Sequence, residues 1–86
     1  MYGVIVDVET TGLDSQNDEI IEIGCLKFSF SESKKPQIIS MFSFLQEPTK
    51  ALSKEVKELT GLSDSLLKGQ SINWKYVGDF IKGAEI

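Results

Sequence analysis

Residues 3–13, with the sequence Gly-Val-Ile-Val-Asp-Val-Glu-Thr-Thr-Gly-Leu, decide how the chain folds. The first seven of them are rich in β-branched side chains, which favour a strand, and the segment Thr10-Thr11-Gly12 that follows favours a turn. Successive side chains of a strand point to opposite faces, so one face carries only valines and the other begins with Gly3 and Ile5. Because both faces are apolar, we expect this first strand to be central in its sheet.

Two further strands are predicted after the turn. Residues 19–30 carry apolar side chains with polar interruptions, which is typical of a long and largely buried strand, and the polar segment 14–18 connects it to the first. Residues 31–36 have turn chemistry, and the strand pattern resumes over residues 38–45. We expect three apolar residues of this last strand to share one side: Ile38, Phe42 and Phe44. Consecutive strands with short links favour an antiparallel meander.

Helical spacing replaces strand alternation after Pro48. Leu52, Val56 and Leu59 are separated by four and three residues, which predicts one helix with an apolar stripe. Ser53 is placed to cap its N-terminus and Gly61 to end it.

A short helical turn from Ser63 to Lys68 and an amphipathic helix from Asn73 to Lys82 are predicted next. The apolar face of the second helix is defined by four residues: Trp74, Val77, Phe80 and Ile81. Residues 84–86 begin another element. The predicted fold class is therefore α/β (α+β), with a three-stranded antiparallel meander followed by helices.

Composition excludes several classes of protein. Hydrophobic residues make up 41% and charged residues 26% of the chain, as in ordinary globular domains. No apolar run approaches the roughly 20 residues of a membrane span, and no secretory signal precedes the first strand, so we expect a cytoplasmic protein. The single cysteine, Cys25, excludes an internal disulfide and a zinc site, and is expected to be a small core residue.

The charge balance limits how the chain can bind nucleic acid. Thirteen acidic and nine basic side chains give a net charge of −4, which argues against a broad basic binding patch but not against binding through cations. The absence of histidine removes the commonest general base, so hydrolysis by this chain would rest on carboxylates, metal or lysine.

The acidic pair in the first strand is the strongest candidate site. Asp7 and Glu9 project from the same face with β-carbons about 7 Å apart, so they can share a divalent cation. Carboxylate oxygens suit Mg²⁺ or Mn²⁺, and two such ions can act on a phosphodiester. Gly12 permits a ligand to approach the backbone. The alternative is that both carboxylates are only solvated side chains at a strand end.

Three stretches, in order, resemble the DEDD (DnaQ-like) 3′–5′ exonuclease family of the proofreading type. Val6 to Leu13 and the segment Asp18-Glu19-Ile20-Ile21-Glu22-Ile23-Gly24 are similar to the first exonuclease motif. The segment Glu58-Leu59-Thr60-Gly61-Leu62-Ser63 resembles the one that the family places after its third strand. The resemblance covers nearly the whole chain and implies the N-terminal half of an RNase H-like exonuclease fold.

Site residues follow from this resemblance. It implies that Asp7 and Glu9 are catalytic metal ligands for Mg²⁺ or Mn²⁺. It implies that the 3′-terminal nucleotide contacts four residues of the turn, Thr10, Thr11, Gly12 and Leu13, and that Leu13 wedges against the base. Leu59 and Thr60 would line the same pocket. Glu22 is interpreted as a structural hydrogen-bonding residue, and Thr11 either as a pocket wall or as a turn residue.

The resemblance implies an enzyme that hydrolyses the 3′ ends of single-stranded DNA or RNA and releases 5′-mononucleotides, with a DNA polymerase as a possible partner. The family supplies two more acidic residues and a histidine or tyrosine base from its second half, after the position of Ile86. Residues 1–86 are therefore expected to be truncated before the second and third motifs, inactive alone and self-associating as a dimer. A noncatalytic exonuclease-like module that binds a polymerase or another protein is the alternative function.

Overall fold

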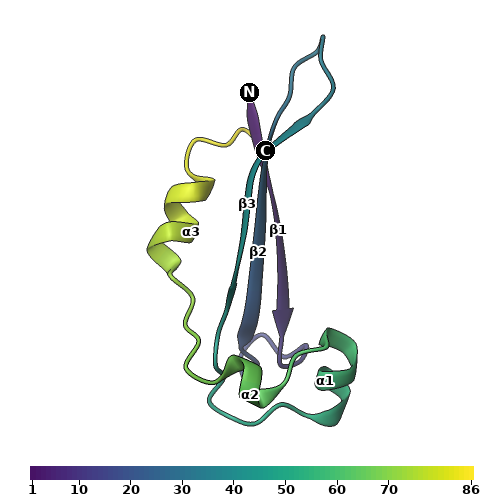
Figure 1. Ribbon diagram of the computed structural model, residues 1–86, viewed down its shortest axis with the longest axis vertical. Helices are drawn as coiled ribbons and strands as arrows, with labels where there is room; N and C mark the ends of the chain where they lie inside the picture. The colour runs from purple at the N-terminus through teal and green to yellow at the C-terminus, as the bar shows by residue number, and fades with distance from the viewer.

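A computed structural model describes all residues, 1–86, as a three-stranded antiparallel sheet followed by three short helices (Figure 1). The strands are β1 (Tyr2–Thr10), β2 (Ile20–Ser29) and β3 (Gln37–Leu45), in the spatial order β1-β2-β3. The helices are α1 (Lys54–Thr60), α2 (Asp64–Leu67) and α3 (Trp74–Ile81). None of them is long and apolar enough to cross a membrane. The predicted meander followed by helices is confirmed.

The helices lie on opposite faces of the sheet. Neighbouring residues of β3 show this, since Phe44 packs against the cluster beneath α3 and Leu45 against the cluster formed with α1 and α2. Figure 1 accordingly shows α3 along one side of the strands and α1 at the foot of the other side. The two faces therefore have separate apolar cores.

A bulge in β2 allows one strand to supply both cores. Glu9 pairs with Glu22 but Thr10 pairs with Ile20, so Ile21 has no partner residue in β1. Ile20 packs against the cluster beneath α3, whereas Ile21 is fully buried in the cluster with α1 and α2. The extra residue thus turns two consecutive isoleucines toward different helices.

The core beneath α3 combines aliphatic and aromatic side chains. Its buried members are Ile23, Cys25, Ile72, Val77 and Phe80. Phe42 packs edge-on against Phe80, with ring centroids 4.7 Å apart. Cys25 is a core residue as predicted, and its burial raises the pKa of the thiol. The predicted apolar face of α3 is partly wrong, because Trp74 is half exposed and Ile81 is also exposed.

The second core holds α1 and α2 at the foot of the sheet. Its members are Ile21, Leu52, Val56, Leu62 and Leu67. Ser53 caps α1 by accepting a hydrogen bond from the Val56 amide, and Gly61 ends it in the left-handed conformation, as predicted. Leu59 does not share the buried stripe, because 86% of its surface is exposed.

Above α1 the sheet has an uncovered apolar surface. We call it the open face, and it carries five apolar side chains: Ile5, Leu26, Phe28, Ile38 and Met41. The predicted grouping of Ile38 with Phe42 and Phe44 is wrong. A bulge at Ile39 in β3 places Ile38 opposite Phe28, on the other face from the two phenylalanines.

The outer edge of β1 is only partly covered. The Glu85 amide donates to the Tyr2 carbonyl at 2.8 Å, and the Val4 amide donates to an Ile86 oxygen at 2.7 Å. The last residues therefore begin to pair with β1 in the parallel direction. Otherwise β1 is the outermost strand and β2 is central, so the prediction of a central first strand is wrong for these 86 residues.

Candidate active site

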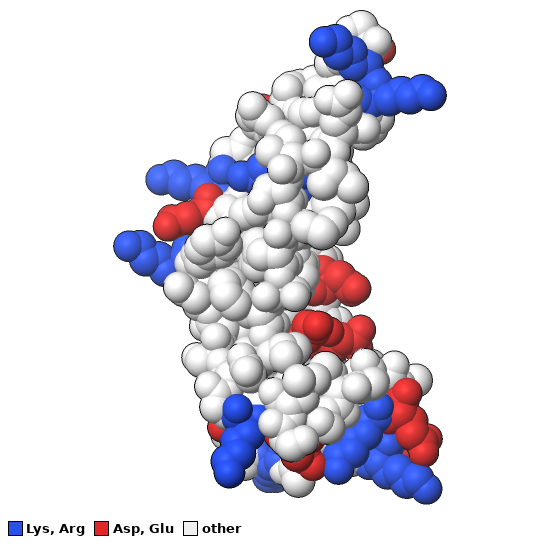
Figure 2. All heavy atoms as spheres, in the orientation of Figure 1, with Lys and Arg blue, Asp and Glu red and all other residues white.

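The acidic residues of β1 lie on the open face, below its apolar part. Asp7 is paired with Gly24 and Glu9 with Glu22, and residues directly opposite in an antiparallel pair share a face. Asp7 is exposed and Glu9 is half buried. Since Gly24 has no side chain, the space beside Asp7 is open. Figure 2 shows acidic side chains gathered beside β1 in the lower half of the sheet.

Glu22 joins the two predicted carboxylates on this face. It was expected to be a structural hydrogen-bonding residue, but its carboxylate has no hydrogen-bond partner within the chain. Its position opposite Glu9 depends on the strand register, which the sequence alone does not provide. The pairing places the like charges of Glu9 and Glu22 side by side, and their repulsion destabilises the pair unless a cation lies between them.

The oxygen atoms of these carboxylates would supply only some of the ligands that a divalent cation requires. Asp7 and Glu9 supply hard carboxylate oxygens, and neither forms an ion pair, since the one ion pair of the chain joins Lys57 to Asp64 at 2.9 Å. No three acidic, histidine or cysteine residues are arranged closely enough to hold a metal by themselves. The arrangement can therefore contribute ligands to a metal site but does not complete one.

The loop after β1 is fixed by the carboxylate of Asp18. One of its oxygens accepts from the Thr11 hydroxyl at 2.8 Å, and the other accepts from the Asp14 amide at 2.8 Å. The Thr11 hydroxyl in turn accepts from the Glu19 amide at 2.9 Å. Both functions of this hydroxyl are thus used inside the loop, which favours the interpretation of Thr11 as a turn residue.

Leu13 projects from this loop into solvent. Its side chain is fully exposed, with 104% of the reference surface accessible. The Thr10 hydroxyl donates to the Gly12 carbonyl at 2.6 Å, and this hydrogen bond holds the backbone directly before Leu13. A large apolar side chain held in water by a hydrogen-bonded loop is suited to contact a ligand.

The α1 residues of the predicted pocket lie at the foot of the sheet, on the same side as the open face. Leu59 is exposed, and the Thr60 hydroxyl donates to the Val56 carbonyl at 2.8 Å and accepts from the Leu62 amide at 3.1 Å. Thr60 therefore closes the end of its helix. Figure 1 shows α1 beside the end of β1, where the acidic strand enters the loop.

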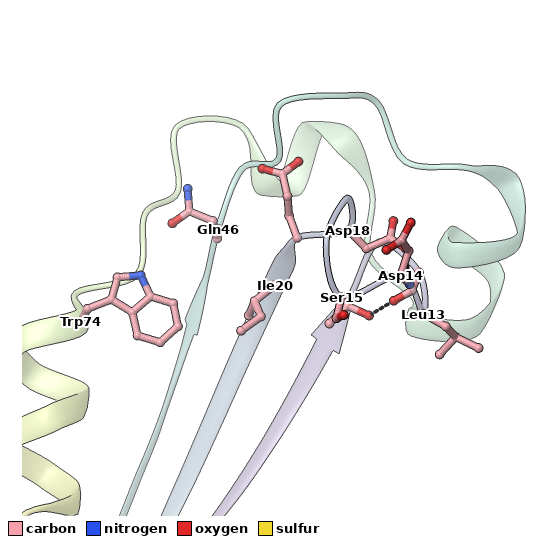
Figure 3. Close-up of a pocket in the computed structure, with 10 residues that line it drawn as sticks. Leu13, Asp14, Ser15, Asp18, Ile20, Gln46 and Trp74 are labelled. Atoms are coloured by element: carbon pink, nitrogen blue, oxygen red, sulfur yellow. Dashed lines mark hydrogen bonds between the residues drawn. The ribbon is translucent and has the colours of Figure 1, made fainter.

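A cavity of about 770 Å³ lies between this loop and the start of α3 (Figure 3). Three of its lining residues were predicted to contact substrate: Thr10, Gly12 and Leu13. The structure adds others that the sequence did not indicate: Asp14, Ser15, Asp18, Glu19, Ile20, Gln46 and Trp74. Figure 3 shows the ring of Trp74 directed toward Ile20. No periodic signal could have found Gln46 or Trp74, because they reach the cavity from separate elements.

The cavity does not include the acidic pair. Thr11, Leu59 and Thr60 are also absent from its lining. The structure therefore brings only Thr10, Gly12 and Leu13 of the predicted site residues together in the cavity. At the cavity rim, a hydrogen bond from Asn17 lowers the pKa of Asp14. This carboxylate therefore stays ionised near neutral pH.

Comparison with known proteins identifies the family. The model of the exonuclease family RNase_T matches residues 4–82, which is nearly the whole chain. The chain therefore belongs to this exonuclease family, of the DEDD type, and its α/β architecture is that of an RNase H-like exonuclease half-domain.

The chain is also similar to bacterial DNA polymerase III proteins. The chain is 39% identical over 67 residues to a PolC-type DNA polymerase III of Thermotoga petrophila, and 34% identical over 82 residues to that of Caldanaerobacter subterraneus. It is 36% identical over 80 residues to the DNA polymerase III epsilon subunit of Treponema pallidum. These matches cover 78%, 95% and 90% of the chain, but only 4%, 6% and 35% of the respective relatives.

Proposed function

We propose that residues 1–86 are the N-terminal portion of a metal-dependent 3′–5′ exonuclease domain that ends before the second and third exonuclease motifs. The protein would hydrolyse phosphodiester bonds at nucleic-acid 3′ ends and release 5′-mononucleotides. The observation that carries the proposal is the position of Asp7 and Glu9, which lie side by side without a cationic partner on an uncovered face. Membership of the exonuclease family supports this chemistry.

The residues of this chain would have distinct tasks. Asp7 and Glu9 would hold Mg²⁺ or Mn²⁺ together with acidic residues from the remainder of the domain. A bound metal of this kind polarises the phosphate and lowers the pKa of an attacking water. Leu13 would stack on the 3′-terminal base while the backbone from Thr10 to Gly12 contacts its sugar, with Leu59 and Thr60 as the facing wall.

The proposed substrate is the 3′ end of single-stranded DNA or RNA, and the proposed partner is a DNA polymerase. The names of the relatives support a polymerase, because they are PolC-type and epsilon proteins of DNA polymerase III. The chain has a net charge of −4, so cations bound at the acidic face would supply the attraction for the phosphate.

The proposal is tested by incubating the complete protein with a single-stranded oligonucleotide labelled at its 5′ end. We expect stepwise shortening from the 3′ end in Mg²⁺ or Mn²⁺, no shortening in EDTA, and 5′-mononucleotides as the product. We expect the isolated 86 residues to release no nucleotides and to bind Mg²⁺ no more tightly than roughly millimolar, since few carboxylates line the site. Internal cleavage, or digestion unaffected by EDTA, would contradict the proposal.

A noncatalytic module that binds a protein partner is the second candidate. The open face favours it, because Ile5, Ile38 and Met41 are each more than half exposed. The assay above separates the two functions. A complete protein that binds a polymerase but releases no nucleotides in Mn²⁺ would be the module.

We also propose that the 86-residue chain forms a two-fold dimer. The peptide groups of Val6 and Val8 alternate with those bonded to β2, so they face an unpaired edge, and Ile5 is exposed on the adjoining open face. Sedimentation equilibrium at micromolar concentration should give twice the 9.6 kDa monomer mass.

Two variants locate the dimer contact. Val6→Pro removes an edge amide but no bond to β2, and Ile5→Lys places a charge on the open face, so at least one should restore the monomer. A wild-type chain that is monomeric, with amide protons protected along residues 4–8, would exclude self-association at this edge.

A further inference from the structure

Asp18 supports the loop that carries Leu13 by steric contact as well as by hydrogen bonds. Its carboxylate bonds to the Thr11 hydroxyl and the Asp14 amide, on the two sides of Gly12 and Leu13. The Asp14 carbonyl accepts from the Asp18 amide at 2.8 Å, which closes the loop from the opposite direction. Residues 11–14 are therefore held by one side chain that comes seven residues after Thr11.

Gly12 fits this arrangement only because it has no side chain. A β-carbon at position 12 would lie 2.8 Å from Cγ of Asp18 and would overlap one of its carboxylate oxygens. The carboxylate thus packs directly against the backbone that precedes Leu13. Glycine is required here by close approach rather than by an unusual backbone angle, because no positive φ occurs at this residue.

We infer that Asp18 is a positioning residue of the exonuclease site, which fixes the turn so that Leu13 meets the 3′-terminal base; this inference rests on the proposed function. Asp18 lines the cavity, but both of its carboxylate oxygens are bonded within the loop, so it acts through Leu13. Its two oxygens must both accept, since their partners are a hydroxyl and an amide proton. Only an aspartate at this position offers two acceptors without lengthening the side chain toward Gly12.

Single and double variants of the complete protein test this role in the 3′-exonuclease assay. Leu13→Ala and Asp18→Ala should each raise KM for a single-stranded oligonucleotide about tenfold, the effect of losing one such contact. If Asp18 acts through Leu13, the double variant should also show about a tenfold rise rather than a hundredfold one. The Mn²⁺ concentration for half-maximal activity should stay unchanged, because Asp7 and Glu9 are intact.

Two further variants keep the test decisive if the alanine variant is poorly folded. Asp18→Asn retains one acceptor and should raise KM less than Asp18→Ala. Gly12→Ala should raise KM because its β-carbon would clash with Asp18. Asp18→Ala should remove that clash, and with it this part of the rise in KM, in the double variant. Asp79→Ala, which removes an exposed carboxylate on α3, is the control with unchanged kinetics.

The outcomes separate this inference from the function on which it rests. A wild-type protein without metal-dependent 3′-exonuclease activity would overturn both. An active wild type in which Asp18→Ala has the wild-type KM, or in which the effects of Asp18→Ala and Leu13→Ala multiply, would overturn only the positioning role.

Discussion

Replacing Asp7 with alanine is expected to lower the exonuclease kcat of the complete protein by at least about 10³-fold, which corresponds to about 4 kcal/mol in the reaction barrier. Asp7 is exposed beside Gly24 and its carboxylate makes no hydrogen bond or ion pair within the chain, so removing that carboxylate should not weaken folding. The loss should therefore appear as lost catalysis without a change in melting temperature. Steady-state kinetics on the labelled oligonucleotide, together with a thermal melt, measure both quantities.

Two variants control for charge and for the neighbouring carboxylate. Asp79→Ala removes the same side chain from α3, on the opposite face of the sheet, and should retain wild-type kcat. Glu22→Gln neutralises the residue opposite Glu9 while keeping its size, so its kcat shows whether Glu22 contributes to the site. An Asp7→Ala protein with full activity would rule out Asp7 as a metal ligand.

The strands and helices could be predicted because their signals are local. The β-branched run of β1 and the helix caps Ser53 and Gly61 are short-range features, and the structure places all of them within a residue or two of the predicted positions. The two bulges could not be predicted. An unpaired residue in one strand is defined only by its partner strand, so Ile38 was assigned to the wrong face and Ile21 to no particular core.

The residues of the candidate site also fall into those that local sequence predicts and those that depend on contacts between elements. Asp7 and Glu9 share a face because strand side chains alternate, which holds for any strand and needs no tertiary information. Glu22 reaches that face through the β1–β2 register, and Asp18 reaches Thr11 through the path of a loop. Trp74 was predicted to be part of a buried helix face, but α3 instead turns Val77 and Phe80 toward the sheet. Sequence periodicity predicts which residues share a face of one helix or strand, whereas contacts between elements depend on the fold.

Ile21→Ala is expected to lower the free energy of unfolding by about 3–4 kcal/mol, the usual cost of deleting a fully buried isoleucine side chain. Ile21 has no exposed surface and is the one residue that the sheet contributes to the buried cluster holding α1 and α2. A domain of 86 residues has a total stability of roughly 4–13 kcal/mol. The variant should therefore lose a large fraction of its stability at 25 °C.

Urea denaturation followed by circular dichroism measures this loss, with Ile38→Ala as the matched control. Ile38 lies in β3 with 64% of its surface exposed, so the same truncation there should cost less than about 1 kcal/mol. Equal losses in the two variants would show that α1 and α2 are not anchored through Ile21. The bulge that buries Ile21 directly follows the Glu9–Glu22 pair, so a strong effect at Ile21 would tie the stability of the foot of the sheet to the segment that carries the acidic face.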